Sequence, residues 1–269
     1  MKSAAKYILV ALLVLSLVVL AGCGGSKPVA PADKPVEKPV EKKVLKVGSE
    51  IAYAPFEYKD EKANKDTGFD LELIQEVGKA AGFDEVKIEN IAWDGLIPAL
   101  NTGKIDVVIS AMTITDERKK GALFSDKYFQ ATQYIAVKEG STIKGSADLK
   151  GKKVAVQTNT TGQYAAEKLG VKDIKKFDTT PDALNALKIG AANAVIADSP
   201  VVLWFIKQNP DAKVVAVQGD FEKEYYGMAM KLGNDELAKK INAGLKKVID
   251  SGKYNEIYKK YFNAEAPKF

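Results

Sequence analysis

The chain has 269 residues, with 40 basic and 35 acidic side chains and a formal net charge of +5 at pH 7. Because this charge is small and the lysines are interspersed with acids, we expect a solvated surface and no nucleic-acid partner. The absence of histidine excludes histidine-based catalytic triads and histidine metal ligands, and it disfavours enzymes that need a proton shuttle near neutral pH. We therefore expect no catalytic residue and no metal.

The first 22 residues (1–22) have the pattern of a secretory signal peptide. A basic start, MKSAAK, precedes an apolar run over residues 7–21 and small residues before Cys23. Such a run is too short for a stable membrane-spanning helix. The segment LAGC resembles the lipobox of bacterial lipoproteins, which implies cleavage before Cys23 and attachment of lipid to its thiol. Because Cys23 is the only cysteine, no disulfide is expected.

Residues 23–43 are expected to form an extended tether. Their segment SKPVAPADKPVEKPVEKK repeats Pro, Val, Glu and Lys without the apolar periodicity that a packed core requires. At about 3.1 Å per residue, this segment would reach roughly 55 Å when extended. We therefore expect the folded part to lie outside the cytoplasm, held away from the membrane to which its lipid anchors it.

The next part of the chain alternates strands with helices. We expect a strand at 44–49, an amphipathic helix at 70–81, a strand at 86–91, a helix at 94–103 and a strand at 105–110. This alternation is typical of a parallel sheet with helices on its faces.

A second series with the same rhythm begins near Lys152. Strands are expected at 153–157, 174–177, 193–198 and 213–218, and helices at 161–170, 181–190 and 200–209. Long amphipathic helices follow at 234–251 and 254–262. The sequence thus predicts two similar α/β lobes, joined by extended segments near 130–134 and 222–226. Lobe 1 would comprise residues 44–131 and 226–269, and lobe 2 residues 132–225.

Polar motifs follow several of these strands, where sheets of this class bind ligands beside helix N-termini. They are SEIAYAPFEY, IAWDG, SAMTITDER, VQTNTTGQ and IADSP. The third motif holds Arg118, the only arginine in the chain. A guanidinium group can clasp a carboxylate through two parallel hydrogen bonds, which lysine cannot do. Arg118 is therefore expected to bind a ligand carboxylate, and the alternative is a surface ion pair with Asp116 or Glu117.

In combination, several motifs resemble those of family-3 solute-binding proteins, which capture amino acids for ABC importers. These motifs are YAPFEY, TGFDLEL, WDGLIPAL, SAMTITDERK, FSDKYF, DLKGKKVAVQ and SGKYNEIYKKYF. The resemblance covers essentially all of residues 44–269. It implies a two-lobed α/β fold of the type II periplasmic-binding-protein kind, in which each lobe is a mostly parallel sheet flanked by helices and two crossing strands form the hinge. It also implies a free L-amino acid as ligand, an ABC permease as partner, a monomeric state and no cofactor.

The resemblance also assigns the two charged ends of the ligand. Arg118 would bind the α-carboxylate, with help from the backbone N–H groups of Thr113 and Thr161. Asp198 would bind the α-ammonium group, with the Thr113 hydroxyl and the Ala111 carbonyl. The remaining residues predicted around these groups are Ser110, Met112 and Thr160.

Aromatic residues match the positions that flank the ligand's side chain. They are Tyr53, Phe56 and Trp93, and the alternative for each is a place in the core. The second tryptophan, Trp204, lies on an apolar face of a predicted helix and is predicted to be core.

Glu50 and Gln157 match positions at the far end of the ligand's side chain. A carboxylate beside aromatic faces suits a guanidinium or ammonium group. Arginine is therefore favoured, or another basic amino acid such as lysine. Glutamine is the alternative, because its amide could bind both side chains. Ala197 counts against glutamine, since glutamine-specific relatives have a larger polar residue there.

Two other classes of protein use this fold. Cyclohexadienyl dehydratases could employ a buried carboxyl group such as that of Glu50 as a proton donor. The expected clasp for an intact amino acid and the absence of histidine disfavour such an enzyme. A receptor-type sensor or a cell-wall lytic enzyme would need further chain beyond Phe269 and is not expected.

Overall fold

The computed structural model describes residues 42–267. The predicted signal peptide, the predicted lipidation site at Cys23 and nearly all of the predicted tether lie outside these residues. Within the described part of the chain, no helix combines the length and the apolar character needed to span a lipid bilayer.

An eight-stranded sheet runs through the fold in the order β4-β1-β5-β10-β6-β9-β7-β8. The outer strands of one half are parallel to each other: β1 (Val44–Ser49), β4 (Glu85–Asn90) and β5 (Val107–Val108). The same holds for the other half, with β7 (Lys153–Gln157), β8 (Asp173–Phe177) and β9 (Ala194–Asp198). The predicted α/β class, with mostly parallel strands in each half, is confirmed.

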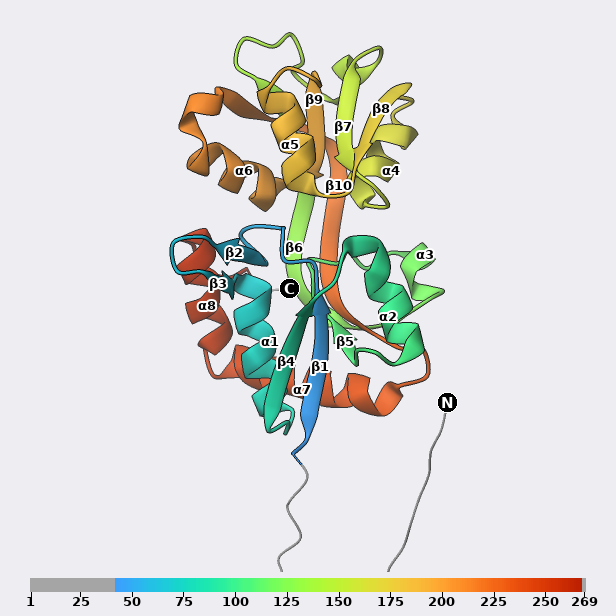
Figure 1. Cartoon of the computed structure of the whole chain (residues 1–269), viewed down its shortest axis with the longest axis vertical. Coiled ribbons are helices and arrows are strands. Elements are labelled where there is room, and N and C mark those ends of the chain that lie inside the picture. Colours follow the sequence, from blue (N-terminus) through green and yellow to red (C-terminus); the bar gives the residue numbers. More distant parts are fainter. Residues whose placement is uncertain (1–41, 268–269) are drawn as a thin grey trace, which may run out of the picture. The chain divides into compact units, whose positions relative to one another are not determined.

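Two long strands connect the halves. β6 (Leu123–Lys138) and β10 (Val214–Met230) pair antiparallel to each other in the middle of the sheet (Figure 1). β10 also pairs with β5 of the first half, and β6 with β9 of the second. The pairing is irregular between Gln218 and Lys223, close to the point where the strands pass from one half to the other. The two predicted crossing segments lie inside these strands.

In residues 42–267, seven helices lie where the apolar periodicity predicts them. They are α1 (Phe69–Ala80), α2 (Leu96–Thr102), α4 (Thr161–Lys168), α5 (Thr180–Lys188), α6 (Ser199–Gln208), α7 (Asp235–Asp250) and α8 (Lys253–Phe262). The short helix α3 (Asp116–Lys119), which has no apolar residue, is not among the predicted helices. The side chains of Thr160, Thr179 and Asn234 cap α4, α5 and α7 by accepting a free backbone N–H of the first turn. Helix α2 ends at Gly103, whose φ of 75° suits a residue without a side chain.

Some short elements are not predicted by the sequence. A hairpin of β2 (Tyr58–Asp60) and β3 (Lys65–Thr67) follows the first motif, although its charged sequence has no apolar alternation. Single 3₁₀ turns occur at η1 (Trp93–Gly95), η2 (Ser146–Leu149) and η3 (Pro210–Ala212). The strand predicted at 213–218 is the beginning of the much longer β10.

The core of the first half is an aromatic cluster. Phe56 and Phe129 meet edge to face at 4.8 Å between ring centroids, and Phe129 stacks on Tyr226 at 5.4 Å. Burying one such side chain contributes about 1.5–3 kcal/mol. Val201, at the start of α6, belongs to the same cluster, so the second half packs directly on the core of the first.

The second half has apolar layers on both faces of the sheet. Ile135 and Val137 of β6 join the layer that includes Ala166 of α4, whereas Ala136 joins the layer of Leu187 in α5. This alternation follows from the period of two along a strand. Helices cover both faces of the sheet. The carboxyl ends of the parallel strands point toward the junction between the halves (Figure 1).

Candidate ligand-binding site

A small polar pocket lies where the strand ends of the two halves meet. Its free volume is about 20 Å³, which is room for about one water molecule. Residues of both halves line it, and hydrogen bonds from Trp93 and Arg118 to Asn159 join the halves beside it, so the halves are closed on the site. The pocket is lined by Glu50, Tyr53, Trp93, Ser110, Ala111, Thr113, Arg118, Gln133, Gln157, Thr160, Thr161, Gly162, Thr180, Ile196, Ala197 and Asp198.

Two of the predicted site residues lie elsewhere. Phe56 is completely buried in the aromatic cluster and stacks behind Tyr53, with 6.2 Å between the ring centroids. The Met112 side chain is packed in a separate apolar cluster that includes Leu96 and Val108. The structure thus places both side chains in the core, where they contribute apolar packing. All the other predicted residues line the pocket.

Arg118 is held at the pocket wall by three contacts. Its Nη1 donates to the Thr113 carbonyl at 2.8 Å, and its Nη2 donates to the Asn159 carbonyl at 3.3 Å. The guanidinium carbon lies 4.9 Å from the ring centroid of Trp93. A guanidinium has five N–H donors, so donors remain for a ligand. Burial lowers the pKa of Arg118, but a guanidinium group is not deprotonated in proteins, so the group stays charged.

The alternative of a surface ion pair for Arg118 is wrong. Asp116 pairs with Lys119 at 3.1 Å, and Glu117 pairs with Lys120. Lys119 and Lys120 thus form ion pairs with the two exposed acids, and Arg118 lines the pocket.

Asp198 is the counterpart of Arg118 on the other half. It ends β9, is 5% exposed, and accepts hydrogen bonds from the Tyr226 hydroxyl at 2.5 Å and from Nε2 of Gln133. Burial, followed by the charge of Glu224, raises the pKa of Asp198 to about 7, against hydrogen bonds that lower it. No lysine or arginine of residues 42–267 forms an ion pair with this carboxylate.

Two buried acids that sequence analysis missed hold the loop after β5. Ala111 has a left-handed φ of 44°, and its N–H donates to Asp70 Oδ2 at 2.7 Å. The hydroxyl of Ser110 donates to Glu57 Oε1 at 3.1 Å and accepts the N–H of Glu50 at 3.0 Å. Burial raises the pKa of both acids, that of Asp70 to about 6, and the charge of Asp70 also raises the pKa of Glu57. These contacts fix the backbone that faces the pocket.

The far end of the pocket is acidic and amide-lined. Gln157 donates from Nε2 to both oxygens of Glu50, at 3.0 and 2.8 Å, and to the Asp178 carbonyl at 2.9 Å. Its Oε1 accepts the hydroxyl of Thr180 at 2.8 Å. Burial raises the pKa of Glu50, and the charges of Asp94 and Asp178 raise it further. The negative potential of this end favours a cation.

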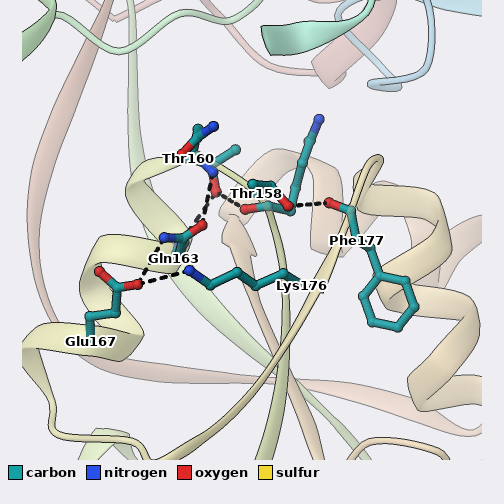
Figure 2. A network of polar contacts seen from close by, with 8 residues as sticks. Thr158, Thr160, Gln163, Glu167, Lys176 and Phe177 are labelled. Carbon is teal, nitrogen blue, oxygen red and sulfur yellow. Dashed lines mark hydrogen bonds and ion pairs between the residues drawn. The ribbon is translucent and has the colours of Figure 1, made fainter.

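The start of α4 contributes backbone donors to the pocket. Thr160 donates its hydroxyl to the Gln157 carbonyl at 2.8 Å and accepts the N–H of Gln163 at 3.3 Å. Gln163 is in turn bonded to Glu167, which also binds Lys176 of β8 (Figure 2). This network fixes the helix end whose free N–H groups and dipole favour an anion.

The family model for bacterial extracellular solute-binding proteins, family 3, matches residues 45–264. The chain belongs to this family. Membership implies an extracytoplasmic location for this solute-binding protein.

Its relatives are amino-acid-binding proteins. A probable histidine-binding protein of Neisseria gonorrhoeae is 39% identical over 262 residues, which cover 95% of each chain. The crystal structure of ArtJ from Geobacillus stearothermophilus, an arginine-, lysine- and histidine-binding protein, is 48% identical, with a TM-score of 0.80, and the match covers 84% of this chain and 97% of ArtJ. An ancestral arginine-binding protein bound to glutamine is 46% identical, with a TM-score of 0.78 and coverage of 84% and 100%.

Contacts outside the pocket also join the halves of this solute-binding protein. The Asn159 carbonyl accepts the indole N–H of Trp93 at 3.1 Å, and the Asn159 side chain donates to Asp94 at 2.9 Å. On the other rim, the rings of Tyr58 and Trp204 lie 5.6 Å apart. The prediction that Trp204 is core is therefore wrong, because it is only half-buried and packs across the junction.

Several pocket residues of this solute-binding protein were not predicted. Gln133 lies on β6, and Thr180 and Ile196 come from the second half. Gly162 is required because a Cβ there would lie 2.7 Å from the Ile196 carbonyl oxygen. The signal for Gln133 was its polar side chain within a predicted crossing segment. In residues 42–267, no group of three or more His, Cys, Asp or Glu side chains could hold a metal ion.

Proposed function

We propose that this solute-binding protein captures a free L-amino acid outside the cytoplasm and delivers it to an ABC permease. One observation carries the proposal: two charged groups line one pocket from opposite halves. They are the only arginine of the sequence and the Asp198 carboxylate, which has no cationic partner among residues 42–267. A zwitterion has the complementary charges in one small molecule. Its carboxylate would meet Arg118 and the start of α4, and its ammonium group would meet Asp198.

Binding would favour the closed arrangement because the ligand bridges residues of both halves. A ligand shifts a conformational equilibrium only as far as its affinities for the two states differ. The contacts that Arg118 and Asp198 offer together are available only when the halves are closed. The protein would act as a monomer, anchored through lipid on Cys23 and supported by the tether of residues 23–43.

A basic amino acid, with arginine first, fits the far end of the pocket. The carboxylate of Glu50 lines the same pocket as the aromatic side chains of Tyr53 and Trp93, and this combination suits a guanidinium through charge pairing and cation–π contact. The similarity to arginine binders supports this choice. Glutamine is the second candidate, because its amide could bond to Glu50 and Gln157 in place of their mutual hydrogen bonds.

A thermal-shift panel of the twenty amino acids tests this function. A ligand present at 100 times its dissociation constant stabilises the folded state by about 2.7 kcal/mol. We expect L-arginine to give the largest increase in melting temperature, followed by lysine or glutamine. Stabilisation by hydrophobic amino acids alone would refute the assignment of Glu50 and Gln157, and stabilisation by none would refute amino-acid capture.

An enzyme on the same fold predicts a different outcome. Incubation with prephenate or arogenate should leave either compound unchanged, because the pocket is arranged to hold an intact zwitterion. Loss of either substrate over time would favour the dehydratase alternative.

A further inference from the structure

The side chain of Glu224 joins both halves at the crossing strands. Glu224 belongs to β10 and is paired with Ala131 of β6. Its Oε2 accepts the hydroxyl of Thr113 from the first half and the hydroxyl of Thr161 from the second, both at 2.8 Å. Its Oε1 accepts Nε2 of Gln133 at 3.2 Å. One carboxylate thus contacts each half and the other crossing strand.

These hydrogen bonds determine how the two threonines face the pocket. A hydroxyl group has one proton to donate, and in Thr113 and Thr161 that proton goes to Glu224. Both residues line the pocket. The Thr161 oxygen also accepts Nε2 of Gln133 at 3.1 Å. Any further hydrogen bond at either hydroxyl oxygen must therefore be an accepted one, which suits a group rich in N–H donors and disfavours a second carboxylate.

Glu224 also adds negative charge beside Asp198. Nε2 of Gln133 donates to both carboxylates, so a single amide group links them. Neither carboxylate forms an ion pair with a lysine or arginine of the described chain. Two neighbouring like charges repel, and a cation between them would relieve that repulsion.

Building on the proposed function, we propose that Glu224 is a positioning residue for the ligand's α-ammonium group. It holds the hydroxyls of Thr113 and Thr161 as acceptors and strengthens the negative potential at Asp198. Because these contacts come from both halves, Glu224 also couples recognition of the ammonium group to closure.

The test compares Glu224→Gln with Glu222→Gln by calorimetric titration with L-arginine at pH 8. Both changes remove one negative charge from the same strand, but Glu222 is exposed and does not line the pocket. We expect Glu224→Gln to weaken binding by about ten- to a hundredfold, as for loss of a hydrogen bond to a charged group. Glu222→Gln should stay within about twofold of wild type, as is usual for a surface substitution.

A pH profile separates positioning of the ammonium group from a general structural role. Tyr53, Arg118, Glu224 and Tyr226 face Asp198 from the neighbouring elements. Since the pKa of Asp198 is raised to about 7, a proton competes with the ammonium group below that pH, and wild-type affinity should fall as the pH drops. Removal of the Glu224 charge lowers the pKa of Asp198, so this decline should move to lower pH in Glu224→Gln.

Glu224→Asp provides a second variant, because it keeps the charge on a shorter side chain. It should restore the wild-type position of the pH decline and part of the affinity. Equal affinities of Glu224→Gln and Glu222→Gln would overturn the inference, as would a loss of affinity without a shift of the decline. Failure of wild type to bind any amino acid would reject the proposed function and this inference with it.

Discussion

Contacts within the protein fix the orientation of Arg118. Two of its donors hold carbonyl oxygens, one from each half, and its planar group lies over Trp93. This arrangement depends on the fork shape of the guanidinium and on its weak hydration, which a lysine ammonium group does not share. The same geometry makes the positive charge of the site difficult to replace.

We predict that Arg118→Lys will bind L-arginine almost as poorly as Arg118→Ala. Truncating one partner of a buried charged pair costs about 2–5 kcal/mol, which is roughly a 30- to several thousandfold loss of affinity. Calorimetric titration measures the effect, and Lys119→Gln on the exposed side of α3 serves as the control. Near-native affinity of Arg118→Lys would contradict the proposed carboxylate clasp.

The loop between β7 and α4 carries contacts that close the halves on the site. Asn159 has a left-handed φ of 57°, which asparagine and glycine tolerate best. This conformation lets its carbonyl meet Trp93 and Arg118 while its side chain reaches Asp94. The loop therefore supplies contacts between the halves that involve no ligand.

We predict that Asn159→Gly will weaken ligand binding by about two- to tenfold, as for loss of one hydrogen bond. Glycine keeps the backbone conformation and the carbonyl, and it removes only the bond to Asp94. Asp94→Ala should have a similar effect, and the double variant should be no worse than either single variant, because all three lack the same bond. Fully additive losses in calorimetric titrations would argue against this contact as part of closure.

How far the sequence predicts the fold differs among its elements. Helix α7 was predictable because its apolar residues recur at helical spacing, and the caps of α4 and α5 are strong local signals. The β2–β3 hairpin has no such signal. Within the pocket, the chemistry of Arg118 was recognisable from its type alone. Glu57, Asp70 and Glu224 were not, since their roles depend on partners 41 to 111 residues away in the chain.

At the scale of the whole molecule, both tryptophans lie at the junction between the halves. Trp93 contacts Asn159 of the opposite half, and Trp204 packs on Tyr58 across the other rim. Each indole should change its environment when the halves separate. The protein thus carries intrinsic reporters on both sides of the site.

We predict that saturating L-arginine will change the intrinsic tryptophan emission of the protein. The change should persist in Trp204→Phe, because Trp93 remains beside the ligand and the Asn159 carbonyl. Stopped-flow fluorescence would give its rate. A titration in which calorimetry detects binding but emission stays constant in both proteins would contradict closure on the ligand.

The position of the pocket between the halves has a kinetic consequence. Because side chains of both halves line the pocket, we expect a bound amino acid to leave only after the halves separate. Dissociation of the ligand then requires the halves to open. The residence time of the ligand would therefore report how often the halves open. A permease that favours the open form would trigger release of the amino acid, and it would not need a higher affinity for the amino acid than the binding protein has.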